Sequence, residues 1–389
     1  MTLLRQFLKS GIPYIVLARI ILVLVLVPET SLWTRRLSFS VVTYIIAYAI
    51  TRSTPLEKRF LHIDWTLGHW LVSEWLTASD FLIVTPNVHQ ELRRIGDVKR
   101  WEERALYERI GWVLELTSNY RGTGWTHEPT KLLPKPQPRE HREILHRVLI
   151  LVLLLSANDI LVKSNPANQL GSKGIHSYGL GWYIASCISA ALCVFLPASL
   201  ALTAYELGMA LLGFKGVWRP LFGSIDDAWC LRRFWGMTWH QIMRRFLSSN
   251  ASFITHRILR LPRNTKASAL VQVSIAFFLS GVIHSTGEYS ITRTHPHSPS
   301  AFEFWKRGSF WFFMVQPLGI AIESTFFGSL KAHRWLGYTW TLTWLMLTVP
   351  MWLNGQVKAG LLDRDIGLVL PFDVYPSHIV HSAFSIGSR

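Results

Sequence analysis

Charged residues are scarce in this chain of 389 residues: they make up 16% of the sequence, whereas soluble domains carry about a quarter. Acidic residues are scarcer than basic ones, with 24 Asp and Glu against 40 Lys and Arg. Half of the residues are hydrophobic. In so apolar a chain, the net charge of +16 is typical of basic loops at lipid headgroups rather than of nucleic-acid binding. We therefore predict a membrane protein with no nucleic-acid partner.

Cysteines are also few. The three cysteines form no CxxC pair and two of them lie in an apolar run, so we interpret Cys187, Cys193 and Cys230 as small core residues. A disulfide framework or a zinc site is not indicated. His295 and His297 stand in a loop rich in Pro and Ser without metal-ligand spacing, which favours a surface loop. We predict no metal.

Long apolar runs are abundant. A spanning helix needs roughly 20 apolar residues, and the runs predict an all-α, polytopic integral membrane protein with roughly seven to nine transmembrane helices and interfacial amphipathic helices. The first run is interrupted by Arg19 and lacks a convincing cleavage site, so a retained span is favoured over a signal peptide. The candidate runs are about 12–28, 37–51, 69–85, 144–163, 179–197, 198–214, 268–288, 309–328 and 335–354.

Two of these runs leave alternatives open. Glu74 and Asp80 punctuate the run 69–85, and its tryptophans favour an interfacial helix. Pro197 divides the segment 179–214, which is either one long kinked helix or two spans. Its length favours two spans.

The longest polar stretch runs from about Pro86 to Arg142. Its first half, ELRRIGDVKRWEERALYERIGWVLEL, has apolar residues at helical spacing and predicts a surface helix. Its second half holds four prolines and predicts an extended connector. We expect a single domain over residues 1–389, in which 86–143 form the polar helix and connector and 220–290 form a core that carries the motifs.

The first motif is Leu231–Arg245, LRRFWGMTWHQIMRR. Wound as an α-helix, it places Trp235 and Trp239 on one side and Arg233, His240 and Arg244 on the other. Such a helix suits a membrane surface or the edge of a polar cavity, and from this pattern alone an interfacial anchor is favoured. Eight cationic side chains and no acidic one lie between Cys230 and Lys266. Anionic lipid explains that charge, and the same field would hold the phosphates of coenzyme A.

The second motif is Ala269–Tyr289, ALVQVSIAFFLSGVIHSTGEY, a predicted helix on which Ser280, His284 and Glu288 share one face. An ionisable residue inside a span is costly and indicates a functional site. The alternative is a histidine that reaches the headgroups and bonds a neighbouring backbone. Between the motifs, Asn250 begins a glycosylation sequon, but its place beside the first motif argues against a glycan.

Together, FWGMTWHQ and FFLSGVIH resemble the motifs of the membrane-bound O-acyltransferase (MBOAT) family. More narrowly, they are similar to its wax-synthase-like branch, which includes fungal acetyltransferases of terpenoid and meroterpenoid biosynthesis. The resemblance extends to Pro220–Gly223, which leads into the first motif, and to the RGTGW loop at Arg121–Trp125.

The resemblance implies that His284 is the general base and that His240 occupies the second active-site position. A neutral imidazole, with a pKa of about 6.5, suits proton removal from an alcohol. Either His240 or Gln241 would donate a hydrogen bond to the developing oxyanion. Glu288 would orient the ring of His284, and Trp239 would support the site. The candidates for binding the phosphates of coenzyme A are Arg233, Arg244 and Arg245.

We predict direct acyl transfer with acetyl-CoA as co-substrate and no permanently bound cofactor. No cysteine or serine adjoins a histidine in a nucleophile motif, and Ser280 is the one rival. The expected reaction is acetylation of a hydroxyl on a terpenoid-type acceptor by a multi-pass enzyme of the endoplasmic reticulum. Long-chain acyl transfer to a fatty alcohol or sterol is the alternative reaction. A transporter with a histidine relay is the alternative of another class, although no inverted repeat is visible.

Overall fold

The computed structural model describes residues 3–56, 61–129, 140–169, 171–212, 219–293, 296–326 and 333–363. Within these ranges the chain is helical, and its one extended pairing is an isolated bridge between Arg94 and Trp125. The all-α prediction is confirmed. The α-helices are α1 (Leu3–Lys9), α2 (Ile12–Leu26), α3 (Leu32–Arg52), α4 (Leu61–Ser79), α5 (Val88–Glu91), α6 (Leu106–Ser118), α7 (His141–Ser164), α8 (Leu180–Leu211), α9 (Leu231–Arg233), α10 (Arg244–Phe253), α11 (Lys266–Thr292), α12 (Gly308–Met314), α13 (Gln316–Phe326) and α14 (Arg334–Lys358).

Shorter helical segments join these elements. Among the described residues, three of these are π-helices, at Asp80–Val84, Phe234–Thr238 and Ile254–Ile258. The 3₁₀ turns in the described part of the chain are Pro166–Asn168, Ile175–Tyr178, Ile225–Asp227 and Phe304–Lys306. A π-helix inserts one extra residue per turn and often marks a functional site.

Within the described ranges, three helices are long and apolar enough to cross a membrane: α7, α8 and α11. Leucines on these helices point outward, among them Leu153, which is 70% exposed. Such outward apolar faces fit lipid contact. The membrane character of the chain is thus supported, while the count of seven to nine spans stays a prediction.

Helix α8 is one continuous helix of 32 residues with Pro197 inside it, so the division into two spans is wrong. A proline in a helix removes one backbone hydrogen bond and kinks the helix, but flanking apolar residues can carry the helix past that point. At 1.5 Å per residue, α8 is roughly 48 Å long. That exceeds the hydrocarbon core of a bilayer, about 30 Å.

The chain divides into two compact units, each built from two stretches of sequence. Unit 1 comprises Met1–Pro134 and Gly223–Trp344. Unit 2 comprises Lys135–Phe222 and Leu345–Arg389. Residues 223–290 of the expected motif-bearing core therefore belong to unit 1.

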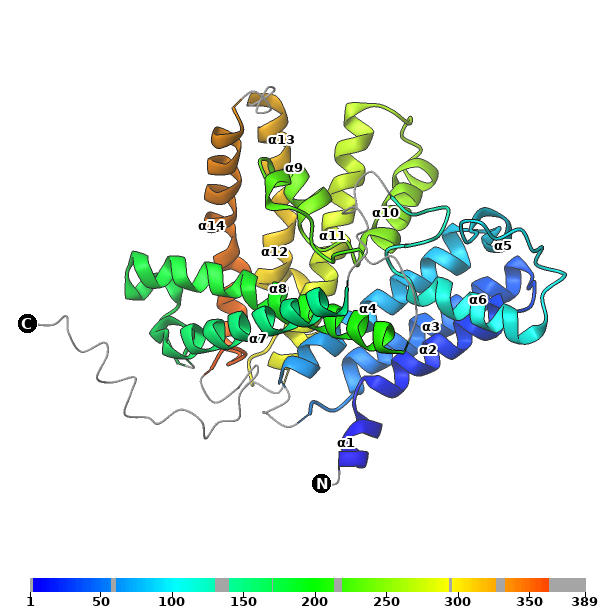
Figure 1. The fold of residues 1–389 in the computed structure, drawn as a ribbon, viewed down its shortest axis with the longest axis horizontal. Coiled ribbons are helices and arrows are strands. Elements are labelled where there is room, and N and C mark those ends of the chain that lie inside the picture. The colour runs from blue at the N-terminus through cyan, green and yellow to red at the C-terminus, as the bar shows by residue number, and fades with distance from the viewer. Residues whose placement is uncertain are drawn as a thin grey trace, which may run out of the picture. The chain divides into compact units, whose positions relative to one another are not determined.

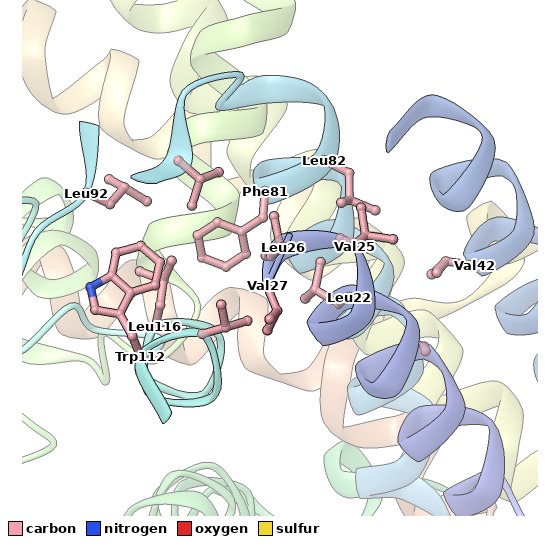
Figure 2. Close-up of a cluster of buried hydrophobic side chains, with 14 of the residues drawn as sticks. Leu22, Val25, Leu26, Val27, Val42, Phe81, Leu82, Leu92, Trp112 and Leu116 are labelled. Carbon is pink, nitrogen blue, oxygen red and sulfur yellow. The ribbon is translucent and has the colours of Figure 1, made fainter. Parts of the chain in front are cut away.

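The core of unit 1 is formed by apolar side chains from α2, α3, α6 and the C-terminal end of α4 with the π-helix that follows it (Figure 2). Leu22 and Leu26 of α2 meet Phe81 and Leu82, and Trp112 and Leu116 of α6 close the cluster. In Figure 1, α2, α3 and α4 run together, and α4 also packs against α11.

Helix α4 is an interior helix of unit 1, and the interfacial interpretation of 69–85 stays a prediction. Glu74 is buried and paired with Arg19 of α2, and the Tyr120 hydroxyl lies 2.8 Å from the same carboxylate. Asp80 is fully buried and paired with Arg245, at 2.7 Å. Charges inside apolar helices are tolerated when they neutralise one another.

The surface helix predicted in the polar stretch is shorter than expected and corresponds to α6, Leu106–Ser118. Upstream of α6 the backbone pairs with a later loop instead: Ile95 N–H donates to Gly124 O at 2.8 Å, and Thr126 N–H donates to Arg93 O at 2.8 Å. These bonds take the groups that a longer helix would use. The prolines Pro134, Pro136 and Pro138 of the expected connector lie outside the described residues.

In unit 2, α7 and α8 pack through leucines, including Leu151, Leu155 and Leu196 (Figure 1). Small polar bonds supplement this packing: Asn165 Nδ2 donates to Ser186 Oγ at 2.8 Å. Asn158 Nδ2 lies 3.3 Å from Cys193 Sγ. Unit 2 thus joins its two long helices chiefly by apolar contact.

Candidate active site

The site begins where α4 and α11 approach each other closely. The predicted helix 269–289 is confirmed and continues past Gly287 to Thr292. A Cβ atom on Gly68 of α4 would lie 2.6 Å from Thr286 O and 2.7 Å from the Cα of Gly287. Only glycine permits two helix backbones to come so near. This contact brings His69, next to Gly68, against His284.

His284 lies between two rings. Its Nδ1 is 2.8 Å from Nε2 of His69, and the ring of Phe313 stacks on it with centroids 4.3 Å apart. His69 in turn has its Nδ1 2.6 Å from the carbonyl oxygen of Trp65. His69 is buried, whereas His284 is partly exposed. His284 is therefore held on one edge by His69 and keeps a reachable surface.

The first motif is not the continuous α-helix that its pattern predicts. It forms α9, then the π-helix Phe234–Thr238, then a break before α10. Trp239 N–H donates to Phe234 O at 2.7 Å. The two residues are five positions apart, which is the hydrogen-bond spacing of a π-helix. The Gln241 side-chain amide donates to Trp235 O and Trp239 O, at 3.1 and 2.6 Å.

These side-chain bonds explain the break, because they occupy carbonyls that a continuing helix would pair internally. Arg244 adds a third such bond, to Gly236 O at 2.8 Å. Thr238 O accepts from Gly223 N–H at 2.9 Å, which fastens the motif to the segment before it. The two stripes of the helical wheel therefore do not describe this segment beyond Thr238.

The two motifs meet through an aromatic cluster. Trp235 contacts Phe313, the ring that stacks on His284, with centroids 6.0 Å apart. Its indole N–H donates to Gln316 Oε1 at 3.2 Å. His240 lies close enough to His69 and His284 for their charges to interact. Burial, together with His69, lowers the pKa of His240 to about 4, so its imidazole is neutral at pH 7.

The supporting residues predicted from the sequence are engaged as follows. Trp239 packs its ring against Phe234 and His240, with centroids 5.7 and 5.6 Å away. Gln241 is buried and holds the loop, as described above. Glu288 Oε2 accepts from the backbone N–H of Ser309, at 3.2 Å, at the start of α12. Nδ1 of His284 is hydrogen-bonded instead to Nε2 of His69.

The three arginines proposed for coenzyme A differ in their partners. Arg233 pairs with Asp227 and lies over the ring of Trp229, 5.1 Å from its centroid. Arg245 forms a two-point pair with Asp80 and also donates to Thr85 Oγ1 at 3.1 Å. Arg244 donates to Gly236 O and to Gln241 Oε1, at 2.8 and 2.5 Å. Its described bonds therefore reach neutral oxygens, whereas the other two arginines meet carboxylates.

Arg244 and Arg245 line a cavity of about 330 Å³ in unit 1. The lining is cationic and polar, with a third arginine, a histidine, three serines and a glutamine. Burial and the charge of Arg245 lower the pKa of the lining histidine, His127, to about 4. The cavity is lined by Arg121, His127, Pro129, Arg244, Arg245, Ser248, Ser249, Ser252 and Gln272.

The loop Arg121–Trp125 contributes to both the core and this cavity. Trp125 is fully buried and donates its indole N–H to Glu115 Oε1 at 3.0 Å. Gly122 and Gly124 have φ values of +65° and +81°, which side-chain-bearing residues rarely adopt. This turn leaves Arg121 on the cavity wall.

The remaining candidates are placed as follows. Asn250 is buried, and its amide nitrogen donates to Leu76 O and Phe246 O at 3.1 and 2.7 Å, bonds that a glycan would displace. Ser280 is buried in α11. Burial raises the pKa of the Cys230 thiol to about 11, which keeps it protonated at neutral pH. His297 is exposed, and His295 lies outside the described residues.

Sequence reasoning missed His69. It lies at the first position of the run 69–85, whose tryptophans favour an interfacial helix, and its partner His284 is far along the chain. The signal was present, because His69 is an ionisable residue in an apolar run and follows a glycine. The rule that singled out His284 applies to His69 as well.

Comparison with known proteins agrees with the motifs. Residues 218–315, which include His240 and His284, match the membrane bound O-acyl transferase family. The acetyltransferase eriL of Hericium erinaceus is 29% identical over 85% of this chain and 87% of its own length. The acetyltransferase ple2 of Rhodocybe pseudopiperita is 29% identical over 76% of this chain and 79% of its own.

A relative named for a different activity also matches. The O-mevalon transferase macI of Penicillium terrestre is 28% identical over 64% of this chain and 62% of its own length. No solved structure matches the chain. The resemblance to the membrane-bound O-acyltransferases is confirmed by these findings. The chain is an acyltransferase, similar to fungal acetyltransferases and O-mevalon transferases.

Proposed function

We propose that this enzyme transfers an acetyl group from acetyl-CoA to a hydroxyl on a terpenoid or meroterpenoid-type acceptor, with His284 as the general base. The observation that carries the proposal is the meeting of the two motifs: His284 is partly exposed, stacked on Phe313, and close to His240. The names of the fungal relatives favour acetyl as the acyl group.

The reaction needs one proton acceptor that later becomes a donor. His284 removes the proton from the acceptor hydroxyl while the hydroxyl oxygen attacks the thioester carbonyl carbon. The C–O bond forms, the C–S bond breaks, and the leaving thiolate takes the proton back from His284 as free coenzyme A. The aromatic rings around His284 exclude water that would otherwise hydrolyse the thioester.

His240 is our candidate donor to the oxyanion that develops on the carbonyl. Its lowered pKa keeps it neutral, and a neutral imidazole still has one N–H to donate. Gln241 uses its amide hydrogens on Trp235 O and Trp239 O. We therefore assign Gln241 the role of holding the loop that carries His240.

We assign the phosphates of coenzyme A to the cavity that Arg121, Arg244 and Arg245 line. Its volume of 330 Å³ lies at the lower end of small-molecule sites, which measure about 300–1,000 Å³. Arg244 is the leading ligand, since Arg245 and Arg233 already pair with carboxylates. The predicted integral, multi-pass topology and the endoplasmic reticulum location belong to the same proposal.

Arg244→Gln tests the donor site. Losing one charged hydrogen bond to phosphate is expected to raise KM for acetyl-CoA about tenfold, with a smaller fall in kcat because Arg244 also bonds Gly236 O and Gln241 Oε1. Arg257→Gln is the matched control, because Arg257 is exposed on the same basic stretch and does not line the cavity. Equal KM values for the two variants would contradict the assignment.

The reaction itself is tested in membranes that express the full chain. Labelled acetyl-CoA or palmitoyl-CoA is offered with farnesol, hexadecanol or ergosterol. We expect acetyl transfer to the terpene alcohol to dominate, and His284→Ala to lower kcat about 10²- to 10⁴-fold. His240→Ala is expected to lose about 10²- to 10³-fold, with partial recovery in His240→Asn, whose amide also donates.

The alternatives give distinct results. A preference for palmitoyl-CoA would favour long-chain transfer, and undiminished transfer by His284→Ala would remove the base assignment. A folded protein with no transfer from either donor would contradict acyl transfer to these classes of acceptor. That result would return the histidine-relay transporter to consideration.

A further inference from the structure

We propose that His69 is a positioning residue that keeps the proton of His284 on Nδ1 and thereby makes Nε2 the atom that accepts the substrate proton. This inference rests on the proposed role of His284 as general base. It adds a residue from α4, a helix that neither motif contains.

The direction of each hydrogen bond follows from the first acceptor. The Trp65 carbonyl oxygen can only accept, so the nitrogen 2.6 Å from it, His69 Nδ1, carries a hydrogen. A neutral imidazole has one N–H, so Nε2 of His69 carries a lone pair. The nitrogen facing that lone pair at 2.8 Å, His284 Nδ1, must then donate. Because the one N–H of neutral His284 is therefore at Nδ1, its Nε2 carries a lone pair.

The surroundings keep both rings neutral at rest. The groups described around the pair are the Trp65 carbonyl, the Trp65 ring 4.2 Å from His69, the Phe313 ring 4.3 Å from His284, and the imidazole of His240. These groups supply no carboxylate. A charge placed on either imidazole would therefore be costly before substrate arrives.

The packing of α4 against α11 holds the geometry. The ring of His69 lies directly over Gly287, where a Cβ atom would collide with its Cε1 and Nδ1. On the other helix, Gly68 meets the backbone of Thr286 and Gly287. The two rings are nearly perpendicular, at 84°. This arrangement directs an edge of His69 at His284 and leaves little room for the ring of His69 to turn.

The arrangement matters most when His284 takes a proton. Its Nδ1–H then belongs to a cation, and a hydrogen bond from a charged donor to His69 Nε2 is stronger than a neutral one. His69 keeps its own proton on Nδ1, and no proton moves along the chain. The role is comparable to that of the carboxylate that orients histidine in a serine-hydrolase triad, with a neutral acceptor in its place.

Two substitutions separate positioning from folding. In His69→Asn, the amide reaches the place of Nδ1 and keeps the bond to Trp65 but loses the acceptor for His284. In His69→Gln, the longer side chain reaches the place of Nε2 and restores that acceptor. We expect kcat to fall about 10- to 100-fold in His69→Asn, the cost of one hydrogen bond to a charged group. KM for acetyl-CoA should change less than about twofold, and His69→Gln should recover most of kcat.

Donor and acceptor for these measurements are acetyl-CoA and farnesol. Equal losses in the two variants, or an unaffected His69→Asn variant that folds normally, would overturn the inference. A rise in KM with kcat preserved would overturn it as well, because that pattern indicates lost binding rather than lost positioning.

A spectroscopic measurement tests which nitrogen of His284 carries the proton, and it does not require the enzyme to be active. Nitrogen-15 signals of labelled histidine in the full chain distinguish protonated from unprotonated ring nitrogens, and the His284→Ala spectrum assigns those of His284. We expect a protonated Nδ1 and an unprotonated Nε2 in the parent, and an added protonated-Nε2 population in His69→Asn. A protonated Nε2 in the parent would contradict the role of His69 directly. Because this readout needs no turnover, it still tests His69 if the proposed acyl transfer fails.

Discussion

The helix pair α4–α11 of unit 1 and the helix pair α7–α8 of unit 2 use different means to hold long helices together. In unit 1, Gly68 and Gly287 bring the backbones into contact, and the interface carries His69 and His284. In unit 2, the pair is joined chiefly by leucines such as Leu155, with small polar bonds beside them. The described histidines of unit 2, His141, His146 and His176, are exposed.

The difference shows where this chain accepts polar groups in its interior. Close backbone contact through glycine fixes side-chain positions tightly, which a proton-transfer site requires. Leucine packing tolerates adjustment and needs no such precision. Substitutions in unit 1 are therefore expected to affect stability and kcat together, whereas substitutions in unit 2 are expected to affect stability alone.

The largest effect is expected at the buried pair between Arg19 and Glu74. Glu74→Gln leaves the guanidinium of Arg19 without a carboxylate among buried groups, at a cost of about 3–5 kcal/mol. We expect a large drop in the thermal unfolding midpoint in detergent. Lys306→Gln is the control, since it removes an exposed pair with Glu303 that is worth about 0–1 kcal/mol. Similar midpoints for both variants would show that the interior of unit 1 does not depend on the pair.

Leu155→Ala addresses the other side of the comparison. Leu155 is buried in the α7–α8 interface, and its truncation should cost about 2 kcal/mol, the low end for such a change. The kcat of the protein that remains folded should stay within about twofold of the parent, because only packing is lost. A large fall in kcat under conditions where the variant is fully folded would contradict this difference between the two units.

Gly68→Ala tests the close contact in unit 1. The added methyl would lie 2.6 Å from a backbone oxygen of α11, and relief of that overlap should cost about 1–2 kcal/mol. Because α4 must move, we also expect kcat to fall by more than the stability loss explains. Gly111→Ala is the matched control: it lies within α6, and a Cβ there meets nothing within 4 Å. An active, stable Gly68→Ala enzyme would show that the contact is incidental.

Much of the fold could be predicted from the sequence, because apolar runs and helical spacing are local signals. The runs at 144–163 and 268–288 became α7 and α11 almost as expected. The first motif failed as a helix for a reason that no local pattern contains: Gln241 and Arg244 turn back to bond the carbonyls of Trp235, Trp239 and Gly236. A helical wheel assumes that backbone groups pair only with one another.

The candidate site divides in the same way. His240 and His284 stand in recognisable motifs, so the sequence predicted both. The neighbours that hold them do not, because His69, Phe313 and Gln316 come from distant segments. Similarly, Glu288 shares a helix face with His284 but bonds Ser309 N–H. Spacing along one helix predicts which side chains share a face, but it does not predict which neighbouring element each one meets.

The smallest expected effect is a pH dependence that belongs to unit 1. Burial and the nearby charge of Arg245 lower the pKa of His127 to about 4, whereas the unfolded value is about 6.5. At pH 7.5 the side chain is neutral in both states and contributes no pH dependence. As the pH falls below about 6.5, the unfolded chain binds a proton that the folded chain excludes, so stability declines until about pH 4.

His127→Gln should remove part of that decline without altering stability at pH 7.5, since it deletes the group that titrates. The unfolding midpoint measured between pH 7.5 and 5 should fall less steeply in this variant than in the parent. His146→Gln, at an exposed position of α7, is the matched control and should leave the slope unchanged. An equal flattening by both substitutions would mean that the acid sensitivity is not confined to the histidines of unit 1, and the contrast between the two units would then not extend to protonation.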